Sequence, residues 1–381
     1  MTRYRDLGLT VGMLPPGPQN AITDVEGVSV GLTTLVEGEG SLQVGEGPVR
    51  TGVTVIVPHP DINSEPVFAG CHRLNGNGEL TGLEWIRESG QLTTPVALTN
   101  THSVGVVRDA LVAAELRGRT DLTAYWSLPV VGETYDGALN DINGMHVRPE
   151  HLFAALDSAT TGPIAEGGVG GGTGMICHEF KGGTGTASRV VGDWIVGALV
   201  QANYGRRERL TVNGVPVGRE VTLSDVPSPW DDEERLARGD PPATREPGAG
   251  SIIVILATDA PMMPHQLERL AQRAGLGIAR VGGAGEHSSG DIFLAFSNGN
   301  RGKIYSYKDE ASAAPIDVSM IPEGSISELF WSAIEATEEA ILNALVAAET
   351  MIGRDGITAH RLDHTALVEI MTRYARGPGA R

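Results

Sequence analysis

The chain has 381 residues, of which 41% are hydrophobic, and it carries a formal net charge of -18. Its length allows two or three domains, although one large α/β unit can fill as many residues. The acidic balance argues against nucleic acid as a partner, because phosphate binding requires a basic face. All apolar runs fall well short of the roughly 20 residues that a membrane span needs. We therefore expect a soluble, cytoplasmic protein with no nucleic-acid or membrane partner.

Several familiar kinds of site are not indicated by the sequence. Cys71 and Cys177 lie far apart and form no CxxC pair, which is typical of cytosolic thiols and not of a disulfide framework. The segment Met1–Leu7 is not followed by the apolar region of a secretory signal. There is no HExxH motif, and the histidines show no ligand spacing, so we expect no metal. The glycine-rich stretch 167–185 completes neither GxGxxG nor GxxxxGK[ST], so we expect close backbone packing and no cofactor.

Hydrophobic periodicity predicts strands mixed with helices along the whole chain. Alternating or continuous apolar runs are typical of strands, and recurrence every three to four residues is typical of helices. In the first part of the chain we expect strands over 28–32, 53–57, 95–99, 128–137 (running into a turn) and 193–203, with helices over 79–86, 104–116 and 149–157. In the last part we expect strands over 252–258, 291–297 and 303–307, a helix over 265–274 stopped by Gly275 and Gly277, and a long amphipathic helix over 326–345.

One segment changes in character, and it ends at an unusual serine. Residues 205–250 become rich in Pro, Asp, Glu and Arg, above all from Val221 onward, which is typical of an exposed flexible linker. Two glycines, Gly248 and Gly250, then precede Ser251 and a buried apolar strand. Ser251 is either a loop serine that begins a core strand or a residue at which the chain is cut.

A cut between Gly250 and Ser251 would create a self-sufficient nucleophile. Ser251 would then carry both a hydroxyl and a free α-amine, whose reference pKa of about 7.7 to 8.0 makes it a usable base near neutral pH. Glycine at position 250 permits the twisted backbone in which the Ser251 hydroxyl reaches the Gly250 carbonyl. An N-to-O acyl shift followed by hydrolysis would separate residues 1–250 from residues 251–381. Because there is no GxSxG elbow, a serine hydrolase here would need such a scheme.

Ser289 and Asp291 are candidates for assisting this serine. They stand two residues apart at the start of an expected strand, so their side chains share one face. A carboxylate that holds a serine hydroxyl, which in turn contacts Ser251, would form a proton relay. The alternative is an Asx-type turn at the entrance of the strand.

These residues and their surroundings resemble a known family, the L-aminopeptidase D-Ala-esterase/amidase and β-peptidyl aminopeptidase family. The resemblance is carried by GAGSIIVILATDAP around Ser251 and, in the expected order, by RLNGNGEL, GLEWIRESG, TNTHSVGVVRDA, VVGETYDGALNDI, EGGVGGGTGM, FKGGTGTASR and LVQANYG. It covers about residues 7–353 and is weakest in the linker and the C-terminal tail. The combination of blocks is far more specific than any one of them.

The resemblance implies roles for individual residues. Ser251 would be the nucleophile exposed by autoproteolysis after Gly250. Ser289 and Asp291 match the serine and the acid that assist it; relatives can carry glutamate at the acid, which leaves the reach of the shorter aspartate open. Asn203 matches an asparagine that stabilises the oxyanion, and Tyr135 matches a tyrosine with a similar role. From the residues alone, Asn203 could equally be a turn residue at a strand end.

Glu133 matches a carboxylate that holds the free amino terminus of the substrate. An aminopeptidase must recognise an ammonium group, and a buried carboxylate does so. Without the resemblance, Glu133 could be a solvated loop acid.

The resemblance also implies a fold, an assembly and a reaction. The fold would be one catalytic α/β domain over residues 1–381, a four-layer α/β/β/α sandwich similar to N-terminal-nucleophile hydrolases but with different strand connectivity. The cleaved heterodimer would form tetramers. The reaction would be the release of N-terminal residues from short peptides, amides or esters through an acyl-enzyme on Ser251. Two alternatives remain: an acyltransferase similar to ornithine acetyltransferases, which use threonine as nucleophile, and an uncleaved, non-catalytic binding protein.

Overall fold

Apolar and β-branched runs form the strands of the protein. The computed structural model describes residues 1–117, 119–120, 125–230, 250–304 and 314–379. The strands are β1 (Ser29–Glu37), β2 (Val49–Val57), β3 (Val67–Arg73), β4 (Gln91–Leu92), β5 (Val96–Asn100), β6 (Val130–Thr134), β7 (Ile176–Cys177), β8 (Phe180–Lys181), β9 (Gly183–Val191), β10 (Trp194–Asn203), β11 (Gly250–Thr258), β12 (Ser289–Ser297), β13 (Met351–Ile352) and β14 (Thr358–Ala359).

Most of these strands belong to two sheets. One sheet has the order β4-β3-β12-β11-β10-β9, and the other has the order β1-β2-β5-β6. Within the larger sheet only β11 and β12 run parallel; their neighbours β10 and β3 are antiparallel to them. The strand that follows the proposed cleavage point, β11, is therefore paired on both sides at the centre of the larger sheet.

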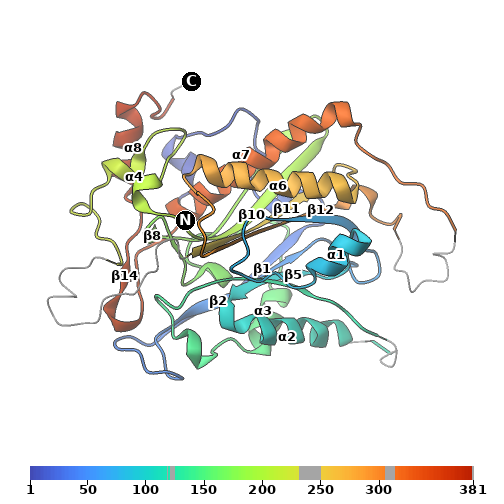
Figure 1. Cartoon of the computed structure of the whole chain (residues 1–381), viewed down its shortest axis with the longest axis horizontal. Helices are drawn as coiled ribbons and strands as arrows, with labels where there is room; N and C mark the ends of the chain where they lie inside the picture. The colour runs from blue at the N-terminus through green and yellow to red at the C-terminus, as the bar shows by residue number, and fades with distance from the viewer. Residues whose placement is uncertain (118, 121–124, 231–249, 305–313, 380–381) are drawn as a thin grey trace.

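Helices cover the outer face of each sheet, so that the molecule has four layers (Figure 1). The helices are α1 (Leu83–Ser89), α2 (Val104–Leu116), α3 (Pro149–Asp157), α4 (Val217–Glu220), α6 (Pro264–Arg280), α7 (Ile326–Val346) and α8 (His364–Arg373). Figure 1 shows α6 and α7 above the larger sheet and α2 and α3 below the smaller one.

Each interface between layers has its own apolar core. Alternate residues of the larger sheet, such as Val254 and Phe293, pack against α6 and α7. The residues between them, such as Ile253 and Leu294, pack against the smaller sheet. The outer face of the smaller sheet packs on α2 and α3. This arrangement confirms the predicted four-layer α/β/β/α sandwich.

The glycine-rich stretch 167–185 serves close packing, as expected. A Cβ at Gly183 would lie 1.9 Å from the carbonyl oxygen of Gly167, and one at Gly185 would lie 2.0 Å from that of Ala340 in α7. Side chains at these positions would clash with backbone, which cannot move aside as a flexible side chain does. Gly185 thus lets β9 lie directly against α7, and Gly183 lets it lie against Gly167.

The predicted stop of the helix over 265–274 is wrong. Helix α6 continues through Gly275 and Gly277 to Arg280. A Cβ at Gly277 would lie 2.7 Å from the carbonyl oxygen of Ile334 in α7. This glycine therefore lets two helices approach and does not end one of them.

The prediction of a flexible linker is wrong for several parts of residues 205–230, which are packed into the core. Within residues 205–230, Leu210, Val212 and Val217 are buried in the core cluster that also holds residues of α6, α7 and α8, and α4 lies within this segment. The turn and loop residues that suggested a linker connect short packed pieces. Residues 231–249, which hold the rest of the expected linker, lie outside the described residues.

Two further expectations concern single elements. Lys303 and Ile304 are not part of a strand, and the remainder of the predicted strand over 303–307 lies outside the described residues. The helix predicted over 79–86 begins later, at Leu83, after the left-handed Gly82. No helix in the described part of the chain combines the length and the apolar character needed to cross a bilayer.

Candidate active site

Ser251 is the second residue of β11 and lies at the end of the central strands. It pairs with Asn203 of β10 on one side and with Gly290 of β12 on the other. Gly250 has a φ of 146°, and a Cβ there would lie 2.5 Å from the carbonyl oxygen of Asn203. Only glycine adopts this conformation in this space without strain. The residue before the serine therefore has to be glycine.

The Ser251 side chain is buried and points toward the space between the two sheets. It shares a face of β11 with Ile253, which packs in the inter-sheet core. Its Oγ accepts a hydrogen bond from the main-chain N–H of Gly290 at 3.1 Å. Because Oγ is the acceptor in this hydrogen bond, the hydroxyl proton remains available for transfer to a base.

The Asn203 amide lies beside this hydroxyl in a fixed orientation. Residues that face each other in an antiparallel pair point to the same side, so Asn203 and Ser251 are neighbours on one face. Asn203 Oδ1 accepts from the N–H of Ile176 at 2.8 Å, and Nδ2 donates to the carbonyl oxygen of Tyr135 at 2.8 Å. Because an amide nitrogen carries two protons, one remains to donate to an acceptor beside Ser251.

Tyr135 is brought to the site through its main chain. It follows β6, its carbonyl oxygen holds Asn203, and its side chain is half exposed. Within the described residues its hydroxyl makes no hydrogen bond, and it lies close to Gly137, where a Cβ would be 2.4 Å from Oη. The main chain of Tyr135 is therefore adjacent to Asn203, and its phenol has no fixed partner in the described part of the chain.

Ser289 and Asp291 form the expected pair, but on the other face of the sheet. Ser289 Oγ donates to Asp291 Oδ1 at 2.6 Å, and both residues are buried. The register pairs Ser289 with Gly250 and Asp291 with Ile252, whereas Ser251 pairs with Gly290. Their side chains thus point away from that of Ser251, and in the described part of the chain the two serine hydroxyls form no hydrogen bond. The expected hydroxyl-to-hydroxyl contact is absent because of this register.

The Ser289–Asp291 pair instead borders the main chain of residues 250–252. Asp291 Oδ1 accepts from the N–H of Ile252 at 3.2 Å. Burial raises the pKa of the Asp291 carboxyl, and hydrogen bonds from Ser289, Asn75 and Ile252 oppose that rise. After a cut at Gly250 this main chain would end in the Ser251 amine, so the pair lies where it could orient the amine.

Asn75 was not singled out by the sequence, yet it binds Asp291. Its Nδ2 donates to Asp291 Oδ2 at 3.0 Å, and its Oδ1 accepts from the Asp291 N–H at 2.5 Å. The stretch Asn75-Gly76-Asn77-Gly78 reads as a turn, which it is. That the turn lies against β12 depends on the pairing of β3 with β12, which no local pattern reveals.

Glu133 is a buried carboxylate and not a solvated loop acid. Its Oε1 accepts from the N–H of Glu79 at 2.9 Å, and its Oε2 accepts from the Thr101 hydroxyl. Burial raises the pKa of this carboxyl. A Cβ at Gly78 would lie 3.0 Å from Gly290 Cα and 3.1 Å from Glu133 Oε1, so only one glycine separates the carboxylate from the strand end beside Ser251.

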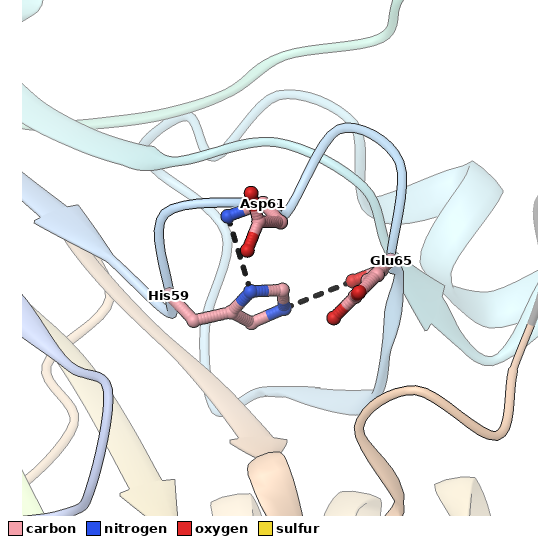
Figure 2. Close-up of side chains that lie close together, drawn as sticks. All are labelled: His59, Asp61 and Glu65. Carbon is pink, nitrogen blue, oxygen red and sulfur yellow. Dashed lines mark hydrogen bonds between the residues drawn. The ribbon is translucent and has the colours of Figure 1, made fainter.

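A histidine with two acids nearby, His59, Asp61 and Glu65, has the composition of a metal site (Figure 2). Both ring nitrogens are already engaged: Nδ1 accepts from the N–H of Asp61, and Nε2 contacts the carbonyl oxygen of Glu65 at 2.9 Å. The two carboxylates pair with Arg301. The ring has no lone pair left for a metal, and the cluster holds a turn in place.

The fold and the site together define a hydrolase of the N-terminal-nucleophile type, in which a serine heads a central strand of an α/β/β/α sandwich. Residues 20–359 match the model of peptidase family S58. The chain therefore belongs to this family and is a serine aminopeptidase/amidase.

Individual relatives agree with this assignment over the whole length. A β-peptidyl aminopeptidase of Sphingosinicella microcystinivorans is 49% identical over 98% of this chain and 93% of that protein. The structure of a Burkholderia sp. β-aminopeptidase has a TM-score of 0.87 and 52% identity, with all of both chains covered. The L-aminopeptidase D-Ala-esterase/amidase of Ochrobactrum anthropi, described as a variant of the Ntn hydrolase fold, has a TM-score of 0.85 and 44% identity over 98% of this chain and 99% of its own. The acyltransferase and the non-enzymatic binding protein are not favoured.

Proposed function

We propose that the chain activates itself by cutting the Gly250–Ser251 bond. The Ser251 hydroxyl attacks the Gly250 carbonyl carbon, the acyl group moves from nitrogen to oxygen, and water hydrolyses the resulting ester. The products are a carboxylate at Gly250 and a free amine at Ser251. The positive φ of Gly250, which only glycine adopts in this space, and the burial of Ser251 support this proposal.

The same serine then acts on substrate. The Ser251 amine takes the proton of the hydroxyl, and Oγ attacks the substrate carbonyl to form an acyl-enzyme, while the leaving amine receives the proton. Asn203 Nδ2 and the Tyr135 hydroxyl are the donors proposed for the oxyanion. Water then releases the acyl group. The observation that carries this proposal is the side-by-side placement of Asn203 and Ser251 at the head of β11.

Glu133 is proposed to bind the ammonium group of the substrate, and the proposed substrates are short peptides or amides with an N-terminal β-amino residue. The buried carboxylate supports the first point. The relatives named β-peptidyl aminopeptidase and β-aminopeptidase support the second. L- and D-alanyl substrates are the competing candidates, given the name of the third relative.

The test compares p-nitroanilides of β-alanine, L-alanine and D-alanine with the same compounds N-acetylated. We expect Glu133→Gln to lower kcat/KM for the free-amino compounds by at least about thirtyfold, because a buried ion pair loses one partner. The acetylated compounds should be poor substrates of both proteins. Ser251→Ala should be inactive and uncut. An equal loss on free and acetylated compounds would contradict the role of Glu133.

We also propose that the protein is cytoplasmic and assembles as a tetramer of cleaved heterodimers. The support is the acidic composition and the resemblance to family members that form tetramers. Light scattering of the purified protein tests the assembly, and fractionation of the native host tests the compartment.

A further inference from the structure

The turn between β3 and α1 lies directly against the start of β12. The N–H of Leu74 donates to the carbonyl oxygen of Asp291, and the N–H of Asn77 donates to that of Ser289. A Cβ at Gly290 would lie 2.6 Å from the carbonyl oxygen of Asn77. The turn thus extends the contact between β3 and β12 to Ser289 and Asp291. These two residues lie on either side of Gly290, which pairs with Ser251.

Two asparagines of this turn make different kinds of contact. Asn77 Nδ2 donates to the carbonyl oxygen of Ser288 at 2.7 Å and so binds only main chain of the neighbouring loop. Asn75 binds the carboxylate and the main-chain N–H of Asp291 and also donates to the carbonyl oxygen of Glu286 at 3.1 Å. Of these two side chains, only that of Asn75 contacts a side chain proposed to take part in the reaction.

The orientation of the Asn75 amide follows from its partners. Its oxygen faces an N–H donor, and its nitrogen faces two acceptors, so the reverse assignment would leave all three contacts repulsive. The Asp291 carboxylate then receives donors on both oxygens: Asn75 on Oδ2, and Ser289 with the Ile252 N–H on Oδ1. These donors on both oxygens hold the Asp291 side chain in one rotamer.

This arrangement determines which way the Ser289 proton points. The Asp291 carboxyl faces donors on both oxygens, so the Ser289 hydroxyl donates its proton to Oδ1. The lone pairs of Ser289 Oγ are then left as acceptors for an N–H beside it. The residue paired with Ser289 is Gly250, whose peptide bond leads to Ser251.

We propose that Asn75 is a positioning residue for the reaction, which fixes the rotamer and the charge of Asp291 and thereby the direction of the Ser289 hydroxyl. The proposal rests on the proposed function, in which the Ser289–Asp291 pair assists the Ser251 amine. The contribution of Asn75 is transmitted through Asp291.

The test uses the full chain as wild type and as Asn75→Ala, Asn75→Asp and Asn77→Ala. We measure kcat on the β-alanyl p-nitroanilide against pH for the processed protein, together with the rate of processing and the Tm. In Asn75→Ala we expect kcat to fall about ten- to hundredfold, the range of a lost hydrogen bond to a charged group. The acid limb of the pH profile should move up by about one pH unit, because the ionised carboxylate loses a donor.

Asn75→Asp should move the acid limb further, since it places a second carboxyl against the first without changing shape. Asn77→Ala, which removes a hydrogen bond of the same turn to main chain only, should lower the Tm without moving the acid limb. An unmoved acid limb in both Asn75 variants would overturn the proposal, and so would an equal movement in Asn77→Ala.

A second readout separates this proposal from the proposed function. The Asp291 carboxyl is titrated by NMR in protein labelled at its aspartate carboxyls, with the signal assigned by Asp291→Asn. A raised pKa in Asn75→Ala supports the positioning role even if the wild type hydrolyses none of the compounds. An unchanged pKa overturns it even if the wild type is fully active.

Discussion

At the scale of single residues, Ser251, Asn203 and Glu133 are buried polar groups whose partners are mostly main-chain atoms. Ser251 is held by Gly290, Asn203 by Ile176 and Tyr135, and Glu133 by Glu79 in addition to Thr101. Main-chain partners move little, so these side chains are positioned before a substrate arrives. Preorganisation of this kind lowers the cost of stabilising charge in a transition state.

Asp136 is a buried acid next to Tyr135, and it should make stability depend on pH. Its Oδ1 accepts from Asn140 Nδ2, its Oδ2 has no hydrogen-bond partner in the described part of the chain, and burial raises its pKa to about 7. Because the folded-state pKa lies above the unfolded one, the folded protein binds the proton more tightly. This contribution to stability is complete below pH of about 4 and is lost as the pH rises toward about 7.

We therefore expect Asp136→Asn, which cannot ionise, to gain stability relative to wild type as the pH is raised. Denaturant unfolding at pH 5 and at pH 8 measures the difference in free energy of unfolding between the two proteins. This difference should move in favour of the variant by about 2 to 4 kcal/mol between the two conditions. A difference that is the same at both pH values would show that Asp136 is ionised throughout.

At the scale of elements, the two glycines of α6 should respond in opposite ways to the same substitution. Gly277→Ala places a Cβ 2.7 Å from the carbonyl oxygen of Ile334 and should destabilise the protein by about 1 to 3 kcal/mol, as overpacking does. Gly275→Ala meets only Phe293, at 3.6 Å, and should stabilise the helix by up to about 1 kcal/mol. Thermal unfolding of both variants checks this, and equal effects would contradict the packing role of Gly277.

The same helix shows what the sequence could and could not predict. Helices α2, α3 and α7 and strands β5, β10 and β11 follow from periodicity, because each has one local pattern over its full length. Gly275 and Gly277 could not be interpreted locally, since their role depends on the position of α7, which is distant in the chain. Ser289 and Asp291 were correctly placed together by their spacing. The face they occupy relative to Ser251 depends on the register of β11 with β12.

At the scale of the whole molecule, the two products of the proposed cut are interleaved. Strands β11 and β12 of the second product lie between β10 and β3 of the first. Helix α7 of the second product carries Glu339, which is buried and pairs with Arg5 and Arg189 of the first. Separation would expose both cores of the larger sheet and leave these charges unpaired. We therefore expect the two products to stay together until the protein unfolds.

The presence of the cut is decided by one measurement on natively purified protein: its mass under denaturing conditions, together with N-terminal sequencing. We expect two fragments that elute together before denaturation, with masses that sum to that of the chain plus one water. The second fragment should begin Ser-Ile-Ile-Val, and Ser251→Ala should remain one chain. A wild-type protein that is a single chain near 40.0 kDa and yet hydrolyses the aminoacyl p-nitroanilides would contradict the central claim.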